Sequence, residues 1–408
     1  MNCRHCCKPL QHTFLDLGFA PPSNSYLNES ELSAPEVYFP LKLKVCDHCW
    51  LVQTEDYAQA DLFFSKDYAY FSSTSTSWLE HAAAYSKDMI TRLALGSNSF
   101  VIEVASNDGY LLKNFVAANI PCLGIEPTAS TAAAAEKLGI PVVREFFGET
   151  LGRRLTEEGR QADLIAGNNV FAHVPDINDF TLGLKAALKP GGTITLEFPH
   201  LKQLIEHIQF DTVYHEHFSY LSLYTVKGVF AAADLRICDV EELPTHGGSL
   251  RIFGCHMDDR REDSANVERV LADELRFGLQ DLDVYRGFQQ RADEVKNGLV
   301  SFLIEQKREG KQVVAYGAAA KGNTLLNYAG IKPDLLSYVC DAAPSKQGKY
   351  LPGSHIPIFS PQKLAQTQPD TVLILPWNIA KEVLEQNRTL QESGTTFVVA
   401  IPQIRSLT

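Results

Sequence analysis

Short apolar runs alternate with amphipathic stretches through the middle of the chain. Residues 99–105, 121–127 and 163–169 are apolar runs of strand length, and each is followed by a stretch of helical character. Gly139 ends one of these helices, and Pro190 with two glycines ends another before a further apolar run. Regular alternation of strand and helix predicts an α/β fold with a parallel, doubly wound sheet, which binds its ligands at the carboxyl ends of its strands.

The same alternation returns near the end of the chain. A helical stretch at 264–309 precedes four apolar runs of strand length, at residues 313–317, 335–341, 371–377 and 397–402. Small residues after the first of these runs open a helix, as they do in the central region. The pattern therefore predicts a second α/β unit in the C-terminal part of the chain.

Length, composition and charge narrow the class of protein. The chain has 408 residues, which is too long for one ordinary core and predicts two or three domains. Its hydrophobic fraction of 45% and charged fraction of 21% are typical of a globular protein. The sequence contains no long apolar run and no signal-peptide pattern at its start, so we expect no membrane span and a cytoplasmic location. The net charge of −12 argues against a nucleic-acid partner.

Four cysteines near the start of the chain form two Cys-x-x-Cys pairs, Cys3 with Cys6 and Cys46 with Cys49. Four thiolates suit tetrahedral zinc, and each pair places two sulfurs on one ion. Because the protein would supply all four ligands, the sequence predicts a closed, structural zinc site in a small N-terminal domain. The alternatives are four unrelated thiols or a redox pair, but no thioredoxin-like βαβ pattern follows these cysteines.

The turn after the first central strand lacks the Gly-x-Gly-x-x-Gly signature of a dinucleotide site. Small residues take the places of the glycines, so nothing in this turn is built to cradle a pyrophosphate. Glu126 closes the second strand, where an acid accepts hydrogen bonds from ribose hydroxyls. These features favour S-adenosylmethionine over NAD, and a domain that binds some other nucleotide is the alternative. The predicted cofactor ligands are Glu103, Ala105, Asn107, Gly109, Tyr110, Glu126, Pro127, Asn168 and Asn169.

Four polar side chains gather at Tyr214, His215, Glu216 and His217, within a run of aromatic residues. In an extended segment, Tyr214 and Glu216 would face away from the two histidines, whereas in a helical turn Tyr214 and His217 become neighbours. We therefore expect a turn or loop. An imidazole, with its ordinary pKa of about 6.5, suits acid and base chemistry at neutral pH. A His-x-His metal site and isolated structural histidines are the alternatives.

A second turn of small residues follows the strand at 313–317. Gly317, Lys321 and Gly322 can hold phosphate at a helix N-terminus, and a nucleotide pyrophosphate is the natural ligand for such a turn in an acidic chain. The alternative is a tight strand-to-helix turn with a solvated lysine. The turn has no dinucleotide signature, so we do not expect NAD there.

Long motifs throughout the chain resemble the sugar C-methyltransferases, which act on nucleotide-linked 4-keto-deoxy sugars. The motifs are the two cysteine pairs and segments 67–82, 102–112, 167–176 and 197–223. The resemblance implies three domains: a zinc-binding domain at 1–75, an S-adenosylmethionine-binding methyltransferase domain at 76–200, and a helical and Rossmann-like domain at 201–408 that binds the nucleotide sugar. It also implies that the substrate lies between the last two domains.

The resemblance further implies roles for individual residues. His217 is the expected base, and Tyr214, Glu216 and His173 are expected active-site polar groups. His173 follows the strand that carries Asn168 and Asn169, so we expect it beside the methyl donor. One of two neighbouring tyrosines reaches the same site in the family, and the candidates here are Tyr68 and Tyr70. The expected substrate ligands are His200, His246, Gly247, Ser249, Gly317, Lys321 and Asn323.

The predicted function is transfer of a methyl group from S-adenosylmethionine to C-3 of a nucleotide-linked 4-keto-6-deoxy sugar by a monomeric enzyme. A histidine base would form an enolate, so the site needs polar groups near the C-4 oxygen but no catalytic metal. Methylation at C-5 and a non-catalytic module that binds the nucleotide sugar are the alternatives. The missing glycine signature disfavours an NAD-dependent sugar oxidoreductase.

Overall fold

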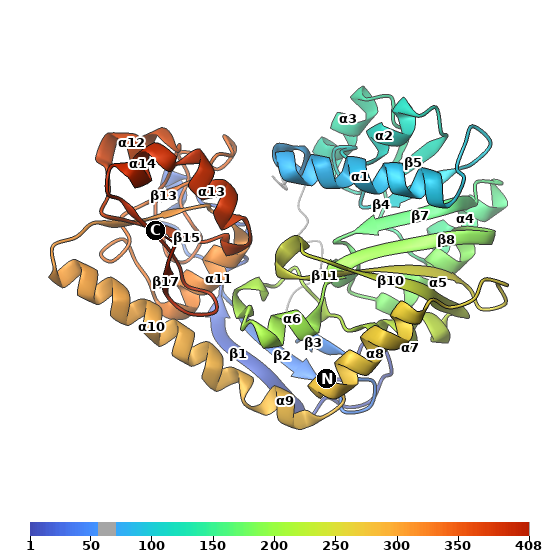
Figure 1. The fold of residues 1–408 in the computed structure, drawn as a ribbon, viewed down its shortest axis with the longest axis horizontal. Helices are drawn as coiled ribbons and strands as arrows, with labels where there is room; N and C mark the ends of the chain where they lie inside the picture. The colour runs from blue at the N-terminus through green and yellow to red at the C-terminus, as the bar shows by residue number, and fades with distance from the viewer. Residues whose placement is uncertain (56–70, 408) are drawn as a thin grey trace.

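The computed structural model describes residues 1–55 and 71–407 of the chain, and its strands form three sheets. Figure 1 shows the central unit and the C-terminal unit side by side, with strands β1, β2 and β3 below and between them. The predicted α/β fold, with its central and C-terminal sheets, is confirmed. No helix in the described part of the chain combines the length and the apolar character needed to cross a bilayer.

The first sheet has four strands in the order β1-β2-β3-β9. Strands β1 (His12–Ala20), β2 (Phe39–Val45) and β3 (Val52–Thr54) come from the N-terminal region. The fourth strand, β9 (Ser219–Tyr220), lies just after the 214–217 cluster in the sequence and pairs antiparallel with β3. The backbone that follows His217 is therefore anchored in the N-terminal sheet.

The central sheet has seven strands in the order β10-β11-β8-β7-β4-β5-β6. Its strands are β4 (Val101–Val104), β5 (Cys122–Ile125), β6 (Val142–Val143), β7 (Ala162–Asn168), β8 (Leu188–Pro199), β10 (Leu235–Leu243) and β11 (Ser249–His256). The helices of this region are α1 (Thr76–Arg92), α2 (Leu112–Ala117), α3 (Ala129–Lys137), α4 (Glu149–Glu157), α5 (Ile177–Ala187), α6 (Leu201–Glu206) and α7 (Leu223–Ala232). The alternation predicted from the sequence is thus confirmed, and the strands from β6 to β8 are parallel.

The central sheet extends beyond residue 200, where the sequence analysis divided the chain. Strand β11 pairs antiparallel with β8, from Ser249 opposite Pro199 to Gly254 opposite Ile194. Strand β10 in turn pairs with β11 and forms the edge. Because this antiparallel hairpin completes the sheet with backbone hydrogen bonds, residues 235–256 pack with the central unit.

The C-terminal sheet has six strands in the order β14-β13-β12-β15-β16-β17, and β17 alone among these described strands is antiparallel. They are β12 (Val313–Tyr316), β13 (Val339–Cys340), β14 (Ile358–Phe359), β15 (Thr371–Ile374), β16 (Thr396–Val399) and β17 (Arg405–Ser406). The strand predicted at 335–341 is shorter than expected, because the ladder to its neighbours begins at Val339.

The helices of the C-terminal unit include the predicted helical stretch at 264–309. This stretch is confirmed as three helices, and a left-handed Gly278 with φ of 96° caps the first of them. The helices are α8 (Ala265–Phe277), α9 (Leu282–Arg286), α10 (Phe288–Arg308), α11 (Ala320–Ala329), α12 (Gln362–Thr367), α13 (Ala380–Gln386) and α14 (Arg388–Glu392).

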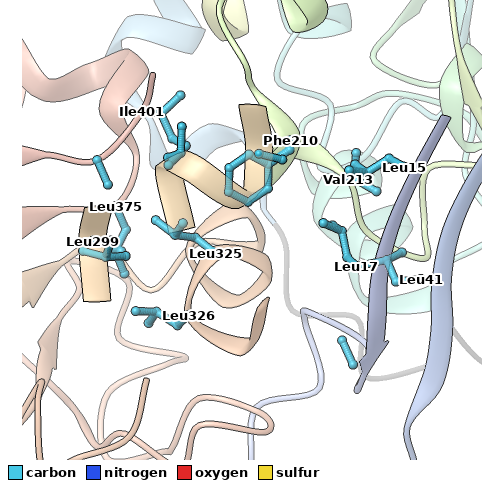
Figure 2. Packing of buried hydrophobic residues seen from close by; sticks show 14 of the residues in the cluster. Leu15, Leu17, Leu41, Phe210, Val213, Leu299, Leu325, Leu326, Leu375 and Ile401 are labelled. Atoms are coloured by element: carbon cyan, nitrogen blue, oxygen red, sulfur yellow. The ribbon is translucent and has the colours of Figure 1, made fainter. Parts of the chain in front are cut away.

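One hydrophobic core joins the N-terminal sheet to the C-terminal unit. Figure 2 shows Leu15 and Leu41 of β1 and β2 on one side and Leu325 of α11 on the other, with Phe210 and Val213 between them. These five residues are 0 to 2% exposed. Burial of each such side chain contributes roughly 1.5–3 kcal/mol. The segment that leads into the 214–217 cluster is therefore held from both sides.

Candidate active site

The four predicted zinc ligands converge although the two pairs are far apart in the sequence. Their sulfur atoms all lie within 4.8 Å of one another, with Cys3 to Cys49 and Cys6 to Cys46 both at 3.5 Å. Tetrahedral zinc with Zn–S bonds of about 2.3 Å would place its sulfurs roughly 3.8 Å apart. The Gln53 side-chain amide also donates a hydrogen bond of 3.2 Å to the Cys3 sulfur. The donor set and its spacing fit a closed zinc site.

Unsatisfied polar atoms collect at the carboxyl ends of β4 and β7. Both polar atoms of the Asn168 amide are buried without a hydrogen-bond partner among the described residues, and the Glu103 carboxylate is fully buried beside Tyr110. Further buried orphan oxygens belong to Ser106, Asp108 and Asn169. Buried polar groups are normally paired, so this edge of the sheet is built to receive donors and acceptors from a ligand. Burial also raises the pKa of Glu103 well above its ordinary value.

The turn after β4 has an unusual backbone that brings it close to its neighbours. Ala105, Asn107 and Gly109 all have left-handed backbones, with φ of 58°, 49° and 80°. A side chain at Gly109 would meet the Ile140 side chain at 2.5 Å, so close packing requires glycine here. Glu126 at the end of β5 accepts hydrogen bonds from the backbone of Asn107 and Thr128, at 3.0 and 2.9 Å. S-adenosylmethionine fits this edge, since its amino group and ribose hydroxyls can donate to buried carboxylates.

Two other predicted cofactor residues flank this turn. Tyr110 follows Gly109 and is 2% exposed, and its ring stacks at 6.0 Å from that of Trp78 in α1. Pro127 follows Glu126 and precedes helix α3. The predicted ligands thus lie at or just after the carboxyl ends of β4, β5 and β7, at one edge of the sheet.

The 214–217 segment forms a turn, as its residue pattern predicted. The His217 backbone N–H donates to the Tyr214 carbonyl at 2.9 Å, and the two rings lie 4.0 Å apart. His217 Nδ1 lies 3.0 Å from the Thr212 carbonyl oxygen. Because a carbonyl oxygen only accepts, Nδ1 must carry the proton, which leaves Nε2 as a proton acceptor. Burial, and then the charge of His173, lower the pKa of His217 well below its ordinary value.

The neighbours of His217 come from both adjoining units. His173 belongs to the short helix η4 (Phe171–His173) after β7, and its ring lies 4.5 Å from His217 in an edge arrangement. Burial lowers the pKa of His173 to about 4, while a hydrogen bond to the Glu216 backbone opposes that shift. The ring of Tyr220 in β9 lies 5.9 Å from His217 on another side. The structure therefore brings His173, Tyr214 and His217 together.

The side chains of Glu216 and His215 contact the N-terminal region instead of this group of rings. The Glu216 carboxylate accepts from the Asn24 amide at 2.7 and 2.9 Å, and His215 Nε2 lies 3.3 Å from the Phe39 carbonyl oxygen. Within the described residues, the one cluster with metal-ligand spacing is that of the cysteines, so the His-x-His interpretation gains no support. Tyr68 and Tyr70 lie outside the described residues.

Lys321 lies in the first turn of α11 but faces the 210–217 segment. Its ammonium contacts the Asn378 amide oxygen at 2.6 Å and lies 4.6 Å from the centre of the Trp377 ring. The Trp377 indole N–H donates to Asp211 at 2.8 Å. Burial raises the pKa of Asp211 to about 6, although Lys321 lowers it. The predicted phosphate ligand is thus part of a cluster that reaches Asp211, three residues before Tyr214.

The remaining predicted substrate residues are divided between this region and the protein interior. Gly247 has φ of 89° and packs on Trp377, and His246 lies in the short helix η6 (Thr245–Gly247) with its ring 5.2 Å from Trp78. By contrast, the side chains of three other residues have protein partners: His200 contacts Glu274 at 2.7 Å, Asn323 donates to the Ser23 carbonyl at 2.6 Å, and Ser249 donates to the Thr245 carbonyl at 2.9 Å. Gly317, with φ of 90°, packs against Pro376.

Several site residues escaped the sequence analysis. Glu197, at the end of β8, is fully buried and accepts hydrogen bonds from Arg251 at 2.9 Å and Thr245 at 2.8 Å, with His81 at 2.8 Å. Burial raises the pKa of Glu197, but His81 and Arg251 outweigh burial and hold it below its ordinary value. Asn24 and Asp211 were also missed. An acid inside an apolar strand was the available signal for Glu197, whereas nothing in the sequence indicated the partner of Asn24.

Known protein families match each of the three parts of the chain. Three family models match the chain: "C-methyltransferase C-terminal domain" at residues 244–402, "Putative zinc binding domain" at residues 3–64 and "Methyltransferase domain" at residues 78–240. The C-methyltransferase NovU of Streptomyces niveus is 32% identical over 404 residues, which cover 99% of this chain and 96% of the relative.

Solved structures match part of the chain at lower similarity. An S-adenosylmethionine-dependent methyltransferase from Clostridium acetobutylicum is 10% identical, covers 43% of this chain and 91% of its own, and has a TM-score of 0.35. The glycopeptide N-methyltransferase MtfA, in complex with sinefungin, is 12% identical, covers 43% and 94%, and has the same TM-score of 0.35. At these scores the solved structures add no argument of their own.

The fold and the cofactor edge define an S-adenosylmethionine-dependent methyltransferase with an N-terminal zinc site. The full-length match to a C-methyltransferase and the three family models narrow this class to the C-methyltransferases. The chain belongs to the sugar C-methyltransferase family and is an S-adenosylmethionine-dependent C-methyltransferase.

Proposed function

We propose that the enzyme methylates C-3 of a nucleotide-linked 4-keto-6-deoxy sugar, with His217 as the base. A carbon next to a ketone can lose a proton, because the resulting enolate places negative charge on the carbonyl oxygen. The site must therefore hold a neutral base beside that carbon and polar groups beside that oxygen. When bound, S-adenosylmethionine supplies a methyl group on a positively charged sulfur, which the carbon nucleophile displaces.

The tautomer of His217 is the observation that carries this proposal. The Thr212 carbonyl holds the proton on Nδ1, so Nε2 presents a lone pair. Burial keeps the imidazole neutral at physiological pH, and a neutral imidazole is the form that accepts a proton. The proposed substrate carries a diphosphate, and its negative charge would raise the pKa of His217 when bound, which would strengthen it as a base.

The groups around His217 have separate roles in this proposal. Tyr214 and His173 lie against the His217 ring and would orient it, and a tyrosine hydroxyl can also donate to the ketone. Glu216, held by Asn24, would keep the turn in its bent shape. The first turn of α11 offers backbone N–H groups at a helix N-terminus, a suitable place for the diphosphate.

The test combines mass spectrometry with solvent exchange. Thymidine and guanosine forms of a nucleotide-linked 4-keto-6-deoxy sugar are incubated with the zinc-containing enzyme in deuterated water, with and without S-adenosylmethionine. The proposal expects deuterium at C-3 without the cofactor, and one added methyl group with loss of the C-3 proton when the cofactor is present. Methylation at C-5, or no exchange and no methylation of either form, would overturn it.

A further inference from the structure

Lys321 lies on the side of helix α11 that faces the turn at residues 214–217, called here the base turn after the proposed role of His217. Lys321 and Thr324 are three residues apart, so they lie on the same side of the helix. The Thr324 hydroxyl donates at 2.8 Å to the carbonyl of Val213, the residue that precedes Tyr214. Trp377, whose ring lies under the Lys321 ammonium, is bonded to Asp211 just before Thr212. Two independent contacts therefore tie the surroundings of Lys321 to the segment that orients His217.

The Lys321 ammonium has hydrogen-bonding capacity that the protein does not use. Its one hydrogen-bond partner within residues 1–55 and 71–407 is the neutral Asn378 amide at 2.6 Å, and it forms no ion pair there. An ammonium has three N–H donors, so two remain for a ligand. Burial lowers the pKa of Lys321, and the charge of Asp211, which accepts from the Trp377 indole, opposes that shift.

The charge of Lys321 acts on the histidines of the site. It contributes to the lowered pKa of His217 and also to that of His246, which lies near 4 mainly because of burial. A second lysine, Lys346, is the one placed at the Gly317 turn itself: its ammonium donates to the Ala318 carbonyl at 2.7 Å. Lys346 also pairs with Asp341 at 3.7 Å, and Asp341 accepts from the Ala318 N–H at 2.7 Å. The cation at the Gly317 turn is therefore Lys346, whereas Lys321 lies beside Trp377, which is bonded to Asp211.

We infer that Lys321 donates a hydrogen bond to the ketone oxygen of the sugar and stabilises the enolate, and is not a phosphate ligand. This inference rests on the proposed function. In the first step the C-3–H bond breaks and the proton goes to His217 Nε2. The electron pair of the broken C–H bond forms the C-3–C-4 double bond, and the carbonyl π electrons move to the oxygen beside Lys321. In the second step C-3 takes the methyl group, the methyl–sulfur electron pair stays on sulfur, and the carbonyl re-forms.

The test separates enolate formation from nucleotide binding. Lys321→Met and Lys321→Arg are compared with wild type and with Lys307→Met, a change at an exposed lysine of α10 that pairs with Asp334. Exchange of the C-3 proton is measured in deuterated water at saturating nucleotide sugar without S-adenosylmethionine. Affinity for the nucleoside diphosphate alone is measured by calorimetry, and it also reports correct folding.

Lys321→Met should lower the exchange rate by roughly 100- to 1000-fold, the usual effect of removing one oxyanion donor, and should change nucleoside diphosphate affinity less than threefold. Lys321→Arg keeps the charge and should retain more exchange than Lys321→Met, while Lys307→Met should match wild type. If Lys321→Met showed unchanged exchange at saturation and a tenfold or greater loss of diphosphate affinity, the inference would be overturned, and Lys321 would be a phosphate ligand. Absence of exchange in wild type would instead refute the proposed function, and the inference with it.

Discussion

A methyl group added at Gly247 should disturb the contact between Trp377 of the C-terminal unit and Asp211, which lies just before the base turn. Gly247 has φ of 89°, a left-handed conformation that costs other residues about 1–2 kcal/mol. In Gly247→Ala the new Cβ would lie 2.3 Å from Cη2 and 2.7 Å from Cζ3 of Trp377, and 2.8 Å from the Gln209 amide nitrogen. These distances are too short, so the Trp377 ring must shift, which would disturb its hydrogen bond to Asp211.

Gly191→Ala is the matched control for this change. Gly191 has φ of 77° but no heavy atom within 4 Å of the position of an added Cβ. Gly191→Ala should therefore cost the backbone term alone, about 1–2 kcal/mol. Gly247→Ala should cost the same backbone term and a further ~1–3 kcal/mol for overpacking. The difference between the two variants isolates the contact with Trp377.

Thermal unfolding and turnover, both measured with zinc bound, provide the assay. Each kcal/mol lowers Tm by roughly 2–4 °C for a unit of this size, so Gly247→Ala should melt several degrees below Gly191→Ala. Turnover should fall in Gly247→Ala alone, because Trp377 positions both Asp211 and Lys321. Equal losses of Tm in the two variants, with normal turnover in both, would show that the contact of Trp377 with Asp211 matters for neither stability nor activity.

Three further substitutions test the other parts of the site. His217→Asn should keep S-adenosylmethionine affinity but lower kcat by about 100- to 10,000-fold, and normal turnover would exclude His217 as the base. Cys46→Ser should lower zinc content by metal analysis together with Tm, whereas Cys7→Ser, an exposed cysteine outside the cluster, should change neither; the zinc assignment fails if Cys46→Ser retains its metal. Asn24→Ala removes two hydrogen bonds from the buried Glu216 carboxylate and should cost ~1.5–3 kcal/mol, seen as a lower Tm and lower turnover. Wild-type values for both would mean that Glu216 needs no support from the N-terminal region.

The sequence predicted the local features of this protein well, for identifiable reasons. The apolar runs at 99–105 and 163–169 became β4 and β7, since a strand buried on both faces needs little besides continuous apolar side chains. Alternation of side chains along an extended segment was enough to expect a turn at 214–217. The Cys-x-x-Cys spacing likewise identified each pair of sulfurs as candidate ligands of one ion, although the fold had to bring the two pairs together.

Tertiary structure alone decided which distant residues share the site. Asn24 meets Glu216, Trp377 meets Asp211, and β9 joins the N-terminal sheet, all across long separations in sequence. Lys321 follows the same logic: its turn resembled a phosphate loop, but its ammonium lies over the ring of Trp377, which is bonded to Asp211. Periodicity and spacing report contacts within a few residues along the chain. Contacts between units depend instead on how whole apolar faces pack together, and here one shared core holds the base turn between the N-terminal sheet and α11.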